Sequence, residues 1–403
     1  MGVHLNTITG ASMTIRLTRR AALAAAATLA APALVRAQGA AVKIGMITTL
    51  SGPGGYLGQD IRDAFTLAAD TGMFGASKID LVVEDDGLKP AQAKQIANRM
   101  LKSDGIRLFT GIVFSNILEA VAPDVLEEGG IYVSPNAGPS SLAGKNCHRN
   151  YFVVSWQNDS LHESAGENAT RLGYKKMYLL APNYPAGKDA ITGFKRFFKS
   201  DIVGESYTKL DQTDYAPEMA QIRAANPDGV FQFHPGGLGI AFLRQYQQAG
   251  LIGKIPMVLA APSLDATTLA AVGEIALGMD VTAHWNSDLD NPANKKFVGA
   301  FVERFKRTPT YYASQGYDTA LAIAAALKAT NGDTKNTEAF RTAMLKADFN
   351  SVRGNFRFGA NQHPVQDWYG LRVERGPDGK LAIVTKGKVL TNHGDAYAAA
   401  CKL

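Results

Sequence analysis

The sequence contains only two cysteines, Cys147 and Cys401, among 403 residues. Two thiols without clustered histidines make a poor zinc site, so we expect no metal and no cofactor. In an oxidising compartment such a pair is more typical of a disulfide. A bridge would tie the C-terminal tail, residues 399–403, to the body of the protein.

Catalytic motifs are also missing. The sequence has no Gly-x-Ser-x-Gly turn, no phosphate loop ending in Lys-Ser/Thr and no histidine pair at metal-binding spacing. The glycines of 234–239 lie between a predicted strand and helix, but they do not form G-x-G-x-x-G and lack the acidic partner about 20 residues on. Asp85 and Asp86 are adjacent acids, which point to opposite faces of a strand, and we expect them in a solvated loop. We therefore predict no enzyme.

Excess charge and long apolar runs are absent after the first forty residues. The net charge is +6, and the arginines at 16, 19, 20 and 36 contribute +4 of it without any acid beside them, so that the rest of the chain has a net charge of +2. A net charge this low gives no clustered basic surface for nucleic acid. No later run reaches the about 20 apolar residues that span a bilayer, so we expect no direct membrane insertion.

The N-terminal segment, residues 1–37, is predicted to be an export signal. Arg16, Arg19 and Arg20 form a basic region, the apolar region 21–34 follows, and small residues end at Ala37, after which we expect cleavage.

Two questions about this leader stay open. Thr18–Leu23 looks like a twin-arginine signal, although Ala22 stands where a bulky apolar residue is usual, and a Sec-type leader is the alternative. Met13 is an alternative start to Met1. Either export route ends in the periplasm.

Strand-like and helix-like segments alternate along the remaining chain. Helices of 10–15 residues between strands predict right-handed crossovers and parallel sheets. The length exceeds the roughly 250–300 residues at which single cores stop growing, and the alternation pauses at a polar passage near Trp156, so two α/β lobes are expected. The expected strands are 42–48, 79–84, 107–114, 131–134, 176–181, 206–210, 229–233 and 256–260; the expected helices are 59–71, 90–102, 116–128, 188–199, 216–225 and 239–249.

Polar and aromatic residues follow the predicted strands at their C-terminal ends. In open α/β sheets this edge forms the crevice where ligands bind. Ser115 opens a helix whose unpaired amides favour an anion such as a carboxylate, although N-capping by Ser115 is the simpler interpretation. The other candidate segments are 51–56, 134–138, 183–184, His234 and 261–263.

Several of these segments together resemble one family. Residues 42 to about 370 are similar to the leucine/isoleucine/valine-type periplasmic binding proteins of ABC transporters, which have the type I periplasmic binding fold. The matching motifs are Ser51-Gly52-Pro53 with Gly58, Glu84-Asp85-Asp86 with Lys89-Pro90 and Ala93, Ser134-Pro135-Asn136-Ala137, Asn183-Tyr184 with Gly187-Lys188-Asp189, and Tyr317-Asp318-Thr319-Ala320.

The resemblance implies a domain organisation and a set of partners. We expect α/β architecture in two lobes, each a parallel sheet flanked by helices, joined by three hinge crossings. Lobe 1 is expected at 40–156 and 285–360, and lobe 2 at 157–284 and 361–398. A monomer would capture a small-molecule ligand between the closing lobes and deliver it to the membrane permease subunits of a transporter.

The resemblance also implies roles for individual residues. Ser115 and Asn116 would meet a ligand carboxylate, and the backbone of Asn136, Ala137 and Gly138 would add further contacts. Tyr184 would close over the ligand from lobe 2. The remaining candidates are Tyr56 at the mouth of the cleft, Trp156 as an aromatic wall or a packed core residue, and His234.

One departure from the family bears on the ligand. Amino-acid binders place an acid after the strand that corresponds to 256–260, where it pairs with the ammonium, and here the loop 260–263 has none before Asp265. A desolvated ammonium without a counter-ion is costly. A benzoate-type aromatic acid is therefore favoured over an amino acid. The alternatives are a branched-chain or other amino acid, a receptor or amide sensor of the same fold, and a hydrolase.

Overall fold

The computed structural model describes residues 1–2 and 41–403. The predicted leader falls on residues outside this range, apart from the first two. Within the described residues, no helix is long and apolar enough to cross a membrane.

The first lobe is built on a parallel sheet that matches the expected alternation. Its strand order is β2-β1-β3-β4-β5, and every pairing is parallel. The order places β1 centrally, where Ile44, Met46 and Ile47 are fully buried. The strands are β1 (Val42–Thr48), β2 (Ile79–Asp85), β3 (Leu108–Thr110), β4 (Ile131–Ser134) and β5 (Tyr151–Val153).

A helix follows each of the strands β1, β2 and β3. Pro90 occupies the first turn of α3, where a missing N–H costs no hydrogen bond. The helices of this part are α2 (Gly55–Asp70), α3 (Pro90–Lys102) and α4 (Ser115–Glu127), with a short 3₁₀ turn, η2 (Ser140–Leu142).

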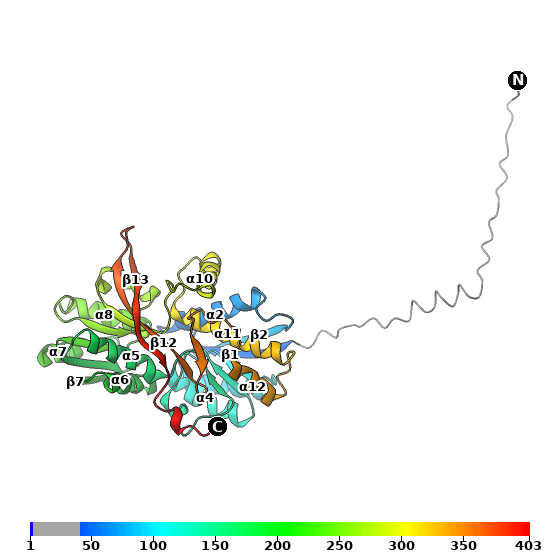
Figure 1. The fold of residues 1–403 in the computed structure, drawn as a ribbon, viewed down its shortest axis with the longest axis horizontal. Helices are drawn as coiled ribbons and strands as arrows, with labels where there is room; N and C mark the ends of the chain where they lie inside the picture. Colours follow the sequence, from blue (N-terminus) through cyan, green and yellow to red (C-terminus); the bar gives the residue numbers. More distant parts are fainter. Residues whose placement is uncertain (3–40) are drawn as a thin grey trace. The chain divides into compact units, whose positions relative to one another are not determined.

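The second lobe combines a parallel sheet with an antiparallel extension. Strands β10, β9, β8, β6 and β7 are parallel neighbours, whereas β12 runs antiparallel to β10, β11 and β13. The long β12–β13 hairpin, coloured orange to red, projects from the helices around it (Figure 1). The strands are β6 (Lys176–Pro182), β7 (Asp201–Thr208), β8 (Gly229–Gln232), β9 (Met257–Ala260), β10 (Asp280–Ala283), β11 (Phe356–Phe358), β12 (Pro364–Arg375) and β13 (Leu381–His393).

The helices of the second half divide between the two lobes. The first five accompany the second sheet: α5 (Asn158–Arg171), α6 (Pro185–Phe197), α7 (Ala216–Ala225), α8 (Gly237–Gln248) and α9 (Ala266–Val272), with 3₁₀ turns η3 (Ala261–Ser263) and η4 (Gly273–Ala276). The chain then returns to the first lobe, where α11 packs along α2, and a final 3₁₀ turn, η5 (Ala398–Ala400), ends it. The returning helices are α10 (Pro292–Phe305), α11 (Tyr311–Ala329) and α12 (Thr337–Lys346).

The chain therefore passes between the lobes after β5, after β10 and before β11. This agrees with the expected two-lobed α/β class. Strand β11 pairs with β12, so its sheet places residues 356–358 in the second lobe, although the expected boundary assigned them to the first. The exact lobe boundaries stay a prediction.

Two local expectations were wrong. Strand β7 begins at Asp201 rather than at 206, because its pairing with β6 continues past Gly204, which interrupts the apolar pattern but makes room for the ring of Tyr178. Asp86 is not solvated: it is fully buried, and its carboxylate accepts hydrogen bonds from the Thr49 hydroxyl and the Leu88 amide. It therefore fixes the turn after β2.

Gly187 of a family motif and Gly138, which follows another, are required by close backbone approach. A Cβ atom on Gly187 would lie 1.8 Å from the carbonyl oxygen of Pro182, at the turn from β6 to α6. A Cβ atom on Gly138 would lie 2.1 Å from the carbonyl oxygen of Trp156, which brings the segment after β4 against the first crossing. Any other residue would force these segments apart.

The crossings are joined by a buried ion pair. The Nε of Arg353 lies 3.0 Å from a carboxylate oxygen of Asp318 on α11, and both side chains are almost completely buried. The guanidinium also donates to the carbonyl oxygens of Val154 and Ser155 at the first crossing and to Gln366 of β12. One side chain thereby connects α11, the first crossing and β12.

Cys147 and Cys401 form a disulfide, as the sequence predicted, with their Cα atoms 5.6 Å apart. The bridge fixes the C-terminal tail to the loop between η2 and β5, and no free cysteine is found among the described residues.

We predict that the double substitution Cys147→Ser/Cys401→Ser lowers the free energy of unfolding by about 2–5 kcal/mol, because the disulfide closes a very long loop in the unfolded chain. The sequence separation is 254 residues. Chemical denaturation of oxidised wild type and variant measures the difference. Reductant should affect only the wild type, and equal unfolding midpoints without reductant would contradict the prediction.

Candidate functional site

A small cavity lies where the carboxyl ends of the two sheets face each other. Its volume is about 20 Å³, enough for about one water molecule. A larger ligand can therefore enter only if side chains or lobes move apart. The lining residues are Val113, Phe114, Ser115, Asn136, Trp156, Asn158, Leu161, His162, Tyr184, Ala186, Phe233, Pro235, Pro262 and Tyr312.

Ser115 lies at the start of α4, but it does not cap the helix. The N-cap position is Phe114, which has an extended backbone and a side chain without a hydrogen-bond acceptor. The amides of the first turn therefore receive no side-chain cap. The Ser115 hydroxyl instead accepts a hydrogen bond from the Asn158 amide at 3.1 Å. The uncapped helix start and a buried hydroxyl thus meet at the cavity, which is an arrangement that suits an anionic group.

Asn136 presents an unused acceptor to the site. Its amide nitrogen donates to the Val113 carbonyl at 2.6 Å, whereas its side-chain oxygen is buried without a partner among the described residues. A buried acceptor of this kind is costly unless something else bonds to it. Asn136 can therefore accept a hydrogen bond from a ligand hydroxyl or ammonium.

Aromatic rings form the walls of the cavity. The ring of Tyr184, at the turn before α6, lies parallel to that of Phe233 with centroids 6.3 Å apart. On its other side it contacts Phe114 of the first lobe, also at 6.3 Å. Trp156 completes this wall and packs edge-on against His284. These surfaces suit a flat apolar body.

The structure brings Ser115, Asn136, Trp156 and Tyr184 to one cavity. It does not bring the other five sequence candidates to that lining: Asn116, Ala137, Gly138, His234 and Tyr56. Whether each lining residue binds a ligand stays a prediction.

The backbone of Ala137 and Gly138 is bonded within the protein. The Ala137 carbonyl accepts from the hydroxyls of Ser134 and Tyr151. The Gly138 carbonyl accepts from the backbone amide of Asn158 at 2.8 Å. These groups hold the segment after β4 in place instead of facing the cavity. Asn116 is half-buried on the second position of α4.

His234 is fully buried in the second lobe, away from the cavity lining. Its ring stacks on Phe242, and its nitrogens lie within hydrogen-bond distance of Thr208 and Gln232. Burial lowers its pKa to about 3, so the ring is neutral. The preceding residue, Phe233, lines the cavity instead, because neighbouring residues at a strand end point to opposite sides.

Several hydrogen bonds join the lobes around the cavity. Tyr56 of α2 donates its hydroxyl hydrogen to Asp265, the N-cap of α9, at 2.9 Å. The backbone amide of Ser140 in η2 donates to Asp189 of α6 at 3.0 Å. The Asn158–Ser115 bond and a backbone bond from Gly237 to the Pro53 carbonyl also connect the lobes. Together they hold the lobes closed.

Sequence analysis missed Asn158, His162 and Tyr312 among the lining residues. His162 is 1% exposed, burial lowers its pKa to about 3, and its Nδ1 has no partner among the described residues. These residues lie at helix starts rather than after strands, so the rule based on strand ends does not find them. Phe114 and Phe233 are the apolar neighbours of the candidates Ser115 and His234. Including the apolar neighbour of each polar candidate would have identified both.

Charged side chains are absent from the described lining of this cavity. The carboxylate of Asp189 bonds to a lining residue, since the side-chain amide of Asn158 donates to it at 2.9 Å, but Asp189 is not itself in the lining. Nor does the described part of the chain contain a cluster of three or more acidic, histidine or cysteine side chains that could hold a metal ion. The site therefore offers hydroxyl and amide groups between aromatic walls, which suits binding rather than catalysis.

Two lobes with a cavity at their facing strand ends define a hinged ligand-binding protein of the α/β class. Residues 41–380 match the family described as periplasmic binding protein, and the chain belongs to this family. It is a solute-binding component of the ABC-transporter type and not an enzyme, and such components deliver small ligands to permease partners. The family implies a periplasmic location.

Similar proteins of known sequence and structure cover most of the chain. A Leu/Ile/Val-binding protein homolog 6 from Brucella melitensis is 28% identical over 84% of this chain and 89% of its own length. A solute-binding protein of an ABC transporter from R. palustris, solved in complex with benzoate, is 29% identical with a TM-score of 0.84, covering 90% of this chain and 100% of the other. An ABC transporter substrate-binding protein from Sphaerobacter thermophilus is 32% identical with a TM-score of 0.81, covering 88% and 99%.

The pKa of Asp265 generates a prediction about pH. Burial raises this pKa to about 6 from 3.8, against the opposing hydrogen bonds from Thr268 and Tyr56. Below about pH 4 the carboxyl is neutral in the folded and unfolded states. Between pH 4 and 6 only the unfolded state ionises, so the free energy of unfolding falls by up to about 3 kcal/mol and stays lower above pH 6.

Asp265→Asn removes the titrating group and keeps an N-cap acceptor. We expect the variant to lose less stability than the wild type between pH 4 and 6.5, by about 3 kcal/mol. Chemical denaturation at both pH values measures this difference. An identical pH dependence in both proteins would show that Asp265 is ionised in the folded state.

Proposed function

We propose that this protein captures a benzoate-type aromatic carboxylate in the cavity between its lobes and delivers it to the permease of an ABC importer. The observation that carries the proposal is the composition of the lining, which combines aromatic walls with uncharged polar groups. The similar R. palustris protein was solved in complex with benzoate, which supports the same ligand class here.

The uncapped start of α4 supports a carboxylate at one end of the ligand. Amides of a helix's first turn and the Ser115 hydroxyl can donate to carboxylate oxygens without a cation. The rings of Tyr184 and Phe233 would contact the planar ring of the ligand. Asn136, with its free acceptor, would bond to a ring hydroxyl where one is present.

A branched-chain amino acid is the second candidate, because curated relatives carry the name Leu/Ile/Val-binding protein homolog. An α-ammonium buried without a counter-ion costs several kcal/mol. No carboxylate belongs to the described lining, and Asp265 is already bonded to Tyr56 and to the Thr268 amide. These contacts favour the aromatic acid.

We expect Ser115→Ala to weaken benzoate binding by about 1–3 kcal/mol through the loss of a hydrogen bond to a charged group. Tyr184→Ala should have a similar effect through lost ring contact. Titration calorimetry with benzoate, leucine and valine measures each affinity. Ser141→Ala is a matched control, since Ser141 is exposed and bonds to Glu119 outside the cavity. Tight leucine or valine binding without a response to benzoate would replace the proposed ligand and leave the transport role unchanged.

Export of this protein also yields a prediction. Cleavage after Ala37 leaves a mature chain that begins at Gln38, and the intact mass of protein from the periplasmic fraction tests this. Full-length protein retained in the cytoplasm after Arg19→Lys/Arg20→Lys would assign the twin-arginine route. Unchanged export would assign the Sec route, and a different mature N-terminus would contradict the predicted site.

A further inference from the structure

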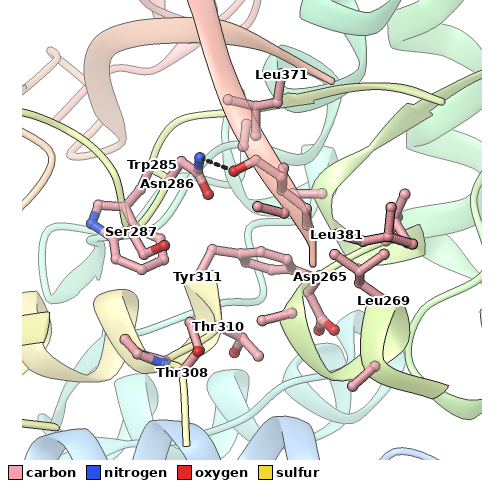
Figure 2. Close-up of a pocket in the computed structure, with 18 of the residues that line it drawn as sticks. Asp265, Leu269, Trp285, Asn286, Ser287, Thr308, Thr310, Tyr311, Leu371 and Leu381 are labelled. Carbon is pink, nitrogen blue, oxygen red and sulfur yellow. Dashed lines mark hydrogen bonds between the residues drawn. The ribbon is translucent and has the colours of Figure 1, made fainter. Parts of the chain in front are cut away.

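A second, much larger cavity lies beside the cleft cavity. It has a volume of about 600 Å³, within the usual range for small-molecule sites. Figure 2 shows Tyr311 lying across it, with Trp285 and Ser287 to one side and Leu381, Leu269 and Asp265 to the other. Its walls come from α9, the segments after β10 and before α11, and the β12–β13 hairpin.

The two cavities share a thin wall. Tyr311 lines the large cavity and the next residue, Tyr312, lines the cleft cavity. In the same way, Ala261 lines the large cavity and Pro262 the cleft cavity. At both places two consecutive residues form the wall, and each of them lines one of the cavities.

Packing holds the Tyr311 side of this wall. The Tyr311 ring lies 4.4 Å from that of Tyr312 and 5.7 Å from that of Trp156, which itself lines the cleft cavity. The Tyr311 hydroxyl is buried and has no hydrogen-bond partner among the described residues. The ring therefore separates the two cavities by its bulk, and no hydrogen bond holds it to a neighbouring strand or helix.

Three polar side chains of the large cavity are already bonded, and the Lys380 ammonium at its edge lies 3.8 Å from a carboxylate oxygen of Asp378. Asp265 accepts from Tyr56 and Thr268, and the Asn286 amide donates to the Ile383 carbonyl, the dashed line in Figure 2. The Thr310 hydroxyl donates to Asp60. The exposed surface that remains is mostly aliphatic and aromatic, including Leu269, Trp285, Leu371 and Leu381. Such a cavity suits an uncharged apolar group.

We infer that Tyr311 sets the length of the ligand, because its ring closes off a cavity that would otherwise hold the second ring of a longer aromatic acid. This inference rests on the proposed function, because it assumes an aromatic acid in the cleft. With the Tyr311 ring in place, the site accepts single-ring acids. When the ring is removed, the two cavities join and a distal ring lies between α9 and the hairpin.

Calorimetry with benzoate and biphenyl-4-carboxylate tests the inference. The measured quantity is the ratio of the two affinities in wild type, Tyr311→Ala and Tyr311→Phe. We expect wild type to favour benzoate by at least about tenfold, and Tyr311→Ala to shift the ratio toward biphenyl-4-carboxylate by at least about tenfold. Tyr311→Phe should keep the wild-type ratio, because the hydroxyl has no partner.

Two further variants separate the cavity from general effects. Ala266→Trp, at the start of α9, fills the large cavity from a half-buried position, and in the Tyr311→Ala background it should restore the wild-type ratio. Tyr317→Ala removes a ring of the same helix that faces a different groove, and its ratio should equal that of wild type. If Tyr311→Ala does not fold, Tyr311→Leu replaces it with the same expected direction.

The outcomes are distinguishable. An unchanged ratio in Tyr311→Ala, or equal binding of both acids by wild type, overturns the subsite while benzoate binding upholds the proposed function. A gain in Tyr311→Ala that Ala266→Trp does not remove overturns the assignment to this cavity. Failure of wild type and all variants to bind either acid overturns the proposed function, and the ligand-length role with it.

Discussion

The guanidinium of Arg353 lies where segments from both lobes meet, and the two-lobed arrangement depends on its contacts. It pairs with Asp318 of α11 and donates to carbonyl oxygens of the first crossing and to Gln366 of β12. Asp318 in turn accepts from Ser351 and the Val352 amide. Breaking a buried ion pair by removing one partner typically costs 3–5 kcal/mol, because a charge stays buried without compensation. Arg353 therefore holds the segments that cross between the lobes together.

Around this anchor, the cleft is held closed by a small number of polar contacts. Tyr56–Asp265, Ser140–Asp189 and Ser115–Asn158 each connect one lobe to the other. Each of these hydrogen bonds contributes only about 1–3 kcal/mol net, the larger values applying to the carboxylate acceptors Asp265 and Asp189, so closure is reversible. The deeply buried Arg353–Asp318 pair keeps the lobes together. The weaker hydrogen bonds between the lobes allow ligand entry to be coupled to closure.

The structure brings some of the residues predicted from the sequence to the cavity lining and places others elsewhere. Ser115, Asn136 and Tyr184 were found because they follow strands whose ends meet at one edge, and the structure brings them to one cavity. His234 was named because it is a polar residue after a predicted strand, whereas the structure places Phe233 in the cavity lining and buries His234 in the core. A shift of one residue at a strand end reverses the direction in which the side chain points. The strand propensity of a residue does not determine this direction. The backbone of Gly138 stays a predicted ligand contact, and in the structure its carbonyl accepts a hydrogen bond from the backbone amide of Asn158.

The sequence by itself determined the α/β class, the two lobes and the disulfide, because hydrophobic periodicity, chain length and a single cysteine pair constrain these features locally or by number. It also determined the absence of an acid between Ala260 and Ser263. Tertiary structure alone decided which side chains share the cleft, that Asp265 is used as a cap and as a partner of Tyr56, and that Tyr311 separates a small cavity from a large one. These features depend on contacts between segments up to 250 residues apart, such as Thr310 with Asp60. Local patterns carry no information about such distant pairs, because packing of the assembled elements determines them.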